Sequence, residues 1–123
     1  MTATPRAVEL AVAAARAASD KLATEIIALD VSEQLVITDA FIVASAETDR
    51  QVRAVVDAIE DALRELGAKP VRREGLNEAH WVLLDYDDIV VHVQHQDDRQ
   101  YYALERLWKD CPVIELPAEV GER

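Results

Sequence analysis

The chain of 123 residues has little cysteine, little glycine and few basic side chains. Its single cysteine, Cys111, excludes an internal disulfide and is typical of a protein from a reducing compartment. Lys and Arg number 13 against 24 Asp and Glu, which gives a formal net charge of −11. Because phosphate neutralisation needs clustered cations, this balance disfavours a general or sequence-specific nucleic-acid binder. It suits solubility or a basic protein partner.

The sequence also has no long hydrophobic run. Arg6, Glu9, Arg16 and Asp20 interrupt the alanine-rich stretch 11–18, so a secretory signal is not expected. No window reaches the roughly 18 apolar residues that span a bilayer. We therefore expect a soluble, cytoplasmic protein that does not contact a membrane.

Hydrophobic periodicity predicts three helices and five strands. The first helix has Thr4 as its cap and Pro5 at its first position, and the second begins at a capping box of Thr48 and Gln51. The predicted helices span 5–22, the stretch from Thr48 to Leu66, and 99–109 behind a cap at Asp97 or Asp98. The predicted strands span 24–31, 35–46, 71–74, 81–86 and 89–94.

These elements follow one another with short connections, in the order α-β-β-α-β-β-β-α. This order predicts an α/β fold with a single mixed β-sheet of about five strands flanked by helices. The length is that of one domain, and half of the residues are hydrophobic, so the fold needs neither a disulfide nor a metal. We expect the domain to cover residues 1–110. Pro112 and Pro117 predict an extended C-terminal tail over residues 111–123.

The strands 81–86 and 89–94 are predicted to form a hairpin around Asp87 and Asp88. A two-residue loop would place Tyr86 across from Ile89, which gives the hairpin an apolar face and a mixed face. The apolar face, predicted to lie in the core, is Val82, Leu84, Tyr86, Ile89, Val91 and Val93, and the mixed face is Trp81, Leu83, Asp85, Val90, His92 and Gln94. Mixed aromatic and polar surfaces recur at protein interfaces, and a helix covering Trp81 is the alternative.

The carboxylates around the predicted turn are the main candidate for catalysis. Asp85 and Asp87 form a D-x-D pattern beside Asp88, and alternate carboxylates on a strand could share Mg²⁺ for phosphoryl transfer. Such a site also needs groups that grip phosphate, and none of the three glycines lies in a loop before a helix. A hydrophilic hairpin turn is the simpler interpretation.

The histidines and the cysteine are weaker candidates. His92 and His95 lie on opposite faces of a strand and cannot chelate together, and His80 could join one of them without a third ligand. Asp110 beside Cys111 would raise the pKa of the thiol, which favours an unreactive cysteine.

Several runs of the chain, in order, resemble the bacterial ribosomal silencing factors, the iojap-like family. The runs that carry the resemblance are Asp39–Ser45, Thr48–Val52, Glu74–Gly75, Trp81–Val93 and Arg99–Trp108. The resemblance extends from about Ala7 to Trp108. Each run is modestly specific, and their common order makes a chance match improbable.

The resemblance implies a small α/β domain related in fold to nucleotidyltransferases but without their catalytic apparatus, and so neither an enzyme nor a cofactor. It implies binding to ribosomal protein fourteen of the large subunit, which blocks association of the subunits and represses translation under nutrient limitation. It also implies a homodimer when the protein is free. In the family pattern, the positions of Trp81 and Tyr86 contact the ribosomal protein.

We expect Asp85, Asp88, Val90 and His92 to complete the partner-binding site. The chain departs from the family pattern in having Asp87 where glycine is usual, and Gln94 where an aromatic residue or methionine is usual. The alternative functions are a metal-dependent nucleotidyltransferase-like enzyme that uses Asp85 and Asp87, and a purely structural dimerisation domain.

Overall fold

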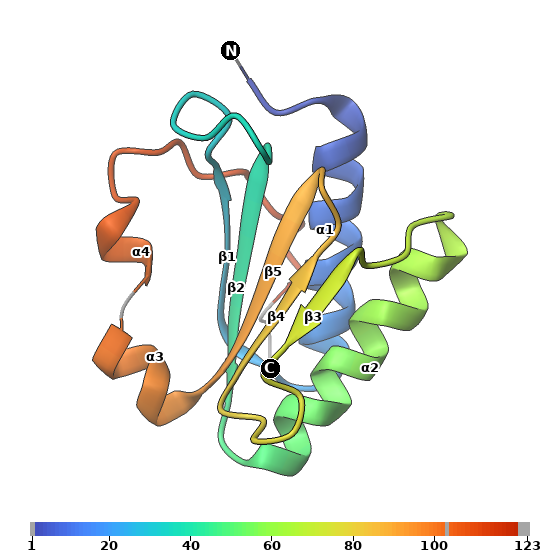
Figure 1. The fold of residues 1–123 in the computed structure, drawn as a ribbon, viewed down its shortest axis with the longest axis vertical. Helices are drawn as coiled ribbons and strands as arrows, with labels where there is room; N and C mark the ends of the chain where they lie inside the picture. Colours follow the sequence, from blue (N-terminus) through green and yellow to red (C-terminus); the bar gives the residue numbers. More distant parts are fainter. Residues whose placement is uncertain (1, 103, 121–123) are drawn as a thin grey trace.

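The computed structural model describes residues 2–102 and 104–120 and contains one mixed sheet with helices on both sides (Figure 1). In chain order the elements are α1 (Pro5–Asp20), β1 (Thr24–Asp30), β2 (Ala40–Ala46), α2 (Asp49–Glu65), β3 (Arg72–Glu74), β4 (Trp81–Asp85), β5 (Ile89–His95), α3 (Gln96–Tyr102) and α4 (Leu104–Leu107). The sheet order is β1-β2-β5-β4-β3. Only β2 and β5 run parallel. The predicted fold class is confirmed.

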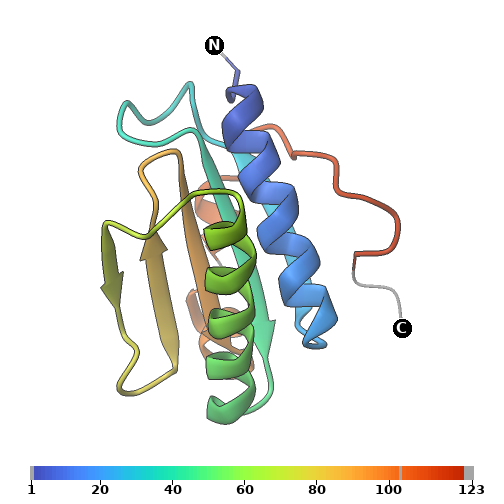
Figure 2. The same cartoon turned by 90° about the vertical axis from the view of Figure 1, so that its right-hand side faces the viewer.

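Helices α1 and α2 lie side by side over one face of the sheet (Figure 2). The main core fills the space between them, with alanines on α1, a valine and leucine stripe on α2, and the inward side chains of the strands. Short alanine side chains let α1 approach the strands closely, because they add little bulk between helix and sheet. Helices α3 and α4 lie on the other side of the sheet, where α3 packs on β5 and β2 (Figure 1).

Both predicted helix starts are confirmed. Thr4 Oγ1 accepts a hydrogen bond from the Ala7 amide, and Thr48 Oγ1 accepts one from the Gln51 amide, so each threonine caps its helix. The reciprocal bond of a capping box is shifted by one residue, because Gln51 Oε1 accepts from the Glu47 amide. Its Nε2 also donates to the backbone carbonyl of Leu22, which ties α2 to the segment after α1.

The predicted strand over 35–46 is wrong in its first half, because β2 begins only at Ala40. Asp30 Oδ1 accepts hydrogen bonds from both the amide and the hydroxyl of Ser32, which turns the chain at the end of β1. The Val31 amide then donates to the Asp39 carbonyl, so residues 32–38 form a closed loop between the two strands.

The predicted start of the last helix is also wrong. Neither Asp97 nor Asp98 caps it, since α3 begins at Gln96 directly after β5. The side chain of His95 caps the helix, because its Nδ1 accepts a hydrogen bond from the Asp97 amide at 3.2 Å. Most side chains of the predicted 99–109 helix, including Tyr101 and Tyr102, lie outside the described residues.

The C-terminal segment runs along the outer edge of β1. The Asp30 amide donates to the Pro112 carbonyl and the Ile114 amide donates to the Ala28 carbonyl, both at 2.8 Å. Further on, Arg16 of α1 pairs with Glu119 at 3.1 Å. The Asp30 amide and the Ala28 carbonyl of the edge strand are thereby satisfied by the tail, which covers this part of the edge.

The backbone conformation of the hairpin turn can be tested by substituting Asp87. The Tyr86 amide donates to the Ile89 carbonyl, and Asp87 takes a φ of 68°, a region that favours glycine. We expect Asp87→Gly to raise the free energy of unfolding by about 0.5–1 kcal/mol, because it relieves this conformation and removes one of three neighbouring carboxylates. Urea unfolding of the wild type and the variant measures the change.

Asp88→Gly is the matched control, since it removes the same charge one residue along, where φ is not positive. It should lower the free energy of unfolding by a similar amount. Glycine there relieves no strain in the folded state and increases the conformational entropy of the unfolded chain. Two variants of equal stability would show that charge, and not backbone conformation, governs this turn.

Candidate functional site

The predicted mixed face of the hairpin exists and carries four of the six candidate site residues. Register pairs Trp81 with Gln94, Leu83 with His92 and Asp85 with Val90. These six side chains, here called the hairpin face, lie on the side of the sheet away from α1 and α2. The predicted apolar face is likewise confirmed, because Val82, Leu84, Ile89, Val91 and Val93 are 0% exposed and lie in the main core.

Trp81 is held in place but not fully covered. Its Nε1 donates a hydrogen bond to His92 Nδ1 at 3.1 Å, and the side chain is half-buried, as are Leu83 and Asp85 on the same strand. Trp108, just after α4, packs against the small apolar cluster that includes Val90 of this face, and its ring meets Phe41 of β2 edge-on at 5.3 Å. Trp81 itself is only half-buried, so it is not sealed off as the covering helix in the alternative interpretation would require.

His92 and Gln94 are the buried polar side chains of the hairpin face. His92 is 6% exposed, and burial lowers its pKa to about 4, so its ring is neutral at physiological pH. The ring also meets Phe41 edge-on at 5.1 Å. Gln94 is 0% exposed, and among the described residues neither of its amide atoms has a hydrogen-bond partner. The centre of the face therefore places two buried, neutral polar side chains next to the half-buried Trp81 and Leu83.

The aspartates around the turn form the hydrophilic hairpin turn. Asp85 Oδ1 accepts a hydrogen bond from the Asp87 amide at 2.9 Å, and Asp85 Oδ2 lies 3.6 Å from Arg72 Nη2. Asp87 lies in the turn beyond the end of β4, so the two carboxylates do not alternate along one strand, which was the arrangement predicted for a shared Mg²⁺. Asp87 and Asp88 are exposed and add negative charge at the edge of the hairpin face.

Tyr86 lies on the opposite side from Trp81. It is 5% exposed, within the main core, and burial together with the negative charge of Glu60 raises its pKa to about 12. The candidate site residues are therefore not all brought together. Trp81, Asp85, Val90 and His92 share the hairpin face, Asp88 stands in the turn at its edge, and Tyr86 faces α2.

The other chemical candidates stay apart. His80 and His95 lie near each other, with ring centroids 5.2 Å apart, while His92 is on a separate face. Within residues 2–102 and 104–120, no group of three His, Cys, Asp or Glu side chains is arranged to hold a metal ion. Burial and then the charge of Asp110 raise the pKa of Cys111, so the thiol is protonated at neutral pH, as the sequence predicted.

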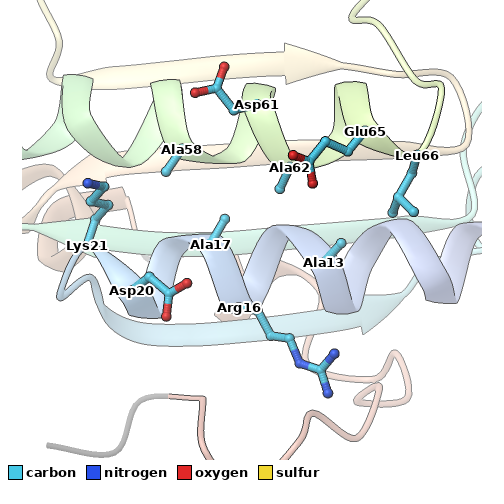
Figure 3. Close-up of a pocket in the computed structure, with 10 residues that line it drawn as sticks. All are labelled: Ala13, Arg16, Ala17, Asp20, Lys21, Ala58, Asp61, Ala62, Glu65 and Leu66. Carbon is cyan, nitrogen blue, oxygen red and sulfur yellow. The ribbon is translucent and has the colours of Figure 1, made fainter.

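A separate open groove of about 580 Å³ lies between α1 and α2 (Figure 3). Its floor consists of short side chains, with Ala13 and Ala17 facing Ala58 and Ala62. Charged side chains stand only at its margins, and Arg16 among them is paired with Glu119. The groove offers no set of converging polar groups of the kind that orients a small substrate.

Sequence reasoning missed the loop between β1 and β2. The apolar pattern predicts a strand through Val36 and Ile37, yet these side chains are 103% and 80% exposed. Thr38 and Asp39, both residues that favour turns, precede the buried run of β2 and were the signal that the apolar run is interrupted there.

Comparison with known proteins places the chain in a family. The family model described as "Ribosomal silencing factor during starvation" matches residues 4–123. A ribosomal silencing factor of Bacillus subtilis is 44% identical over 103 residues, which cover 84% of this chain and 87% of that protein. One of Halalkalibacterium halodurans is 40% identical over 113 residues, covering 92% and 97%.

The fold agrees with this assignment. A crystal structure of a protein from Chromobacterium violaceum superposes with a TM-score of 0.79 at 37% identity, covering 82% of this chain and 84% of that one. None of the described helices has both the length and the apolar character needed to cross a membrane. The match over nearly the whole chain, the identity with curated relatives and the shared fold together show that this protein belongs to the ribosomal silencing factor family.

Proposed function

We propose that the protein represses translation by binding the large ribosomal subunit and preventing its association with the small subunit. The docking partner is ribosomal protein fourteen of the large subunit, and the docking surface is the hairpin face around Trp81. The family membership supports this role, and the observation that carries the surface is the half-buried Trp81 on a face whose other end adjoins the exposed carboxylates of Asp87 and Asp88. A repressor of this kind needs no catalysis, because occupying the joining surface is enough.

The physical basis of recognition is an aromatic anchor on a face that is acidic at its other end. Trp81 is oriented by its bond to His92, so little side-chain freedom is lost when a partner covers it. Asp85 and Asp88 stand at the turn end of the hairpin, at the other end of β4 from Trp81, and their charge would steer a basic ribosomal protein to the face. The net charge of −11 works in the same direction over longer distances.

Further parts of the proposal concern the free protein. We take residues 1–110 to carry the function, with residues 111–123 as a tail, and we propose a cytoplasmic homodimer away from the ribosome that acts when nutrients are scarce. Tyr86 lies in the main core on the other side of the sheet, so its part in docking would be to hold the end of β4 beside the turn at Asp87 and Asp88 and not to contact the partner.

The test is sedimentation with isolated large subunits, with small subunits as the control, together with light scattering of subunit joining. The wild type should pellet with large subunits only and should reduce joining. Trp81→Ala should weaken binding by about 2 kcal/mol, roughly thirtyfold in Kd, because interfacial aromatic anchors contribute this much. If the wild type at saturation leaves joining unchanged, the proposed function is wrong.

Trp108→Ala is the control for this variant. Trp108 packs on Phe41, so its loss should reduce stability first and binding only through unfolding. A Trp81→Ala protein that melts early yet binds normally when folded would show that Trp81 serves packing alone.

A further inference from the structure

A small hollow opens on the hairpin face next to the loop between β1 and β2. Its volume is about 170 Å³, and its walls include Ile37 of the loop, Phe41 of β2, Leu83 of β4 and Val90 of β5. An apolar cavity of about 150 Å³ holds a molecule the size of benzene, so this hollow is large enough for one apolar side chain. It is formed by four separate segments of the chain.

The loop beside the hollow exposes its most apolar residues. Val36 and Ile37 are the two most exposed of the large hydrophobic side chains in the described ranges. The loop is nevertheless fixed, because the Leu35 amide donates to the Val31 carbonyl and the Asp39 amide donates to the Asp88 carbonyl of the hairpin turn. An ordered loop that holds apolar side chains in water is typical of a binding surface.

The charges around the hollow indicate what kind of molecule enters it. At its margin Arg72 and Asp85 lie 3.6 Å apart and largely offset each other, so the opening itself is nearly neutral. Asp87 and Asp88 stand exposed in the adjoining turn. Carboxylates here would repel the phosphates of RNA and attract basic side chains, so the occupant is an apolar side chain flanked by basic residues on a protein.

We propose that this hollow is a socket for one apolar side chain of the large-subunit protein partner, and that Val36 and Ile37 pack beside it as a second anchor. The inference rests on the proposed function and extends its surface from Trp81 to the far end of the hairpin. The loop lies at the same end of the sheet as the β4–β5 connection (Figure 1). The socket and the side chains of Val36 and Ile37 can therefore contact the same partner.

The experiment measures the Kd for isolated large subunits with five proteins: wild type, Trp81→Ala, Val36→Ser, Leu83→Phe and Val113→Ser. Val36→Ser should bind about tenfold more weakly, because it removes apolar contact area at the interface. Leu83→Phe adds apolar area but fills the socket, and it should weaken binding by a similar factor. Val113→Ser, the same substitution at an exposed valine beside β1, should bind within about twofold of the wild type.

The outcomes separate this proposal from the function on which it rests. Wild type that fails to bind large subunits overturns both. Normal binding by the wild type and by both Val36→Ser and Leu83→Phe, with loss in Trp81→Ala, overturns the socket alone. Tighter binding by Leu83→Phe would mean that the hollow stays empty in the complex. Variants that change the oligomeric state of the free protein but not its affinity for large subunits would show that the hollow is a contact between two copies of the chain. That result also overturns the socket proposal.

Discussion

Replacing Gly75 by alanine is expected to lower the free energy of unfolding by about 4 kcal/mol, a large part of the stability of a domain this size. Gly75 has a φ of 85°, and a Cβ placed there would lie 2.0 Å from the carbonyl oxygen of Trp81. That oxygen belongs to the backbone at the start of β4, so it can yield only if the strand moves. Strain of the left-handed conformation adds to the cost.

Gly67 supplies the control within the same chain. It follows the C-cap of α2 with a φ of 81°, and nothing lies within 4 Å of the position of its Cβ. Gly67→Ala therefore carries the conformational penalty without the clash, and it should cost about 1 kcal/mol. Urea unfolding of the two variants beside the wild type measures the difference, which isolates the steric contribution at Gly75.

The Gly75 variant should also lose affinity for large subunits under conditions where it is still folded. The residue it displaces is Trp81, the anchor of the proposed docking surface, whereas Gly67 lies at the end of α2. Equal losses of stability in the two variants would mean that the loop before β4 adjusts freely and does not position Trp81.

The parts of the fold that the sequence predicted well are those in which local signals agree. Thr4 with Pro5, and Thr48 with Gln51, are short-range caps, and the structure uses both. The stripe of α2 and the alternation of the hairpin are periodic over many residues, so errors at one position do not alter the pattern. The pairing of Val82 with Val93 and of Leu84 with Val91 follows directly from a two-residue turn.

The errors arose where a side chain makes a bond that spacing does not reveal. Asp30 accepts a hydrogen bond from the Ser32 hydroxyl, which turns the chain at the end of β1. His95 caps the helix that Asp97 was expected to cap. Both residues bond to the chain two positions further on, in competition with the regular pattern. An apolar run such as Leu35–Ile37 is therefore compatible with a strand or an exposed loop, and composition alone does not distinguish them.

The site was predicted in part for the same reason. The alternation of the hairpin brought Trp81, Asp85, Val90 and His92 to one face, which the structure confirms as an arrangement. The same alternation puts Tyr86 on the other face, and there the family pattern and the strand periodicity point to different roles. The hollow beside Ile37 could not be predicted, because its walls come from four segments whose positions only the folded chain defines.

Acid is expected to destabilise the protein through His92, by about 2.5 kcal/mol between pH 7 and pH 4.5. Burial lowers the pKa of His92 from 6.5 to about 4. Between these values the unfolded chain binds a proton that the folded chain does not, so the free energy of unfolding falls as the pH falls. The stabilisation from the neutral ring is complete above pH 6.5 and is lost progressively towards pH 4.

His92→Gln tests this, because an amide does not titrate and its oxygen can still accept a hydrogen bond from Trp81 Nε1. The variant will be less stable than the wild type at pH 7, since it loses the ring contact with Phe41. Its free energy of unfolding should nevertheless fall about 2.5 kcal/mol less between pH 7 and pH 4.5, as measured by urea unfolding at each pH. Parallel pH profiles for the two proteins would assign the acid sensitivity to other groups.

Because protonating His92 also removes the acceptor that orients Trp81, the wild type should lose affinity for large subunits at the acid end of this range before it unfolds.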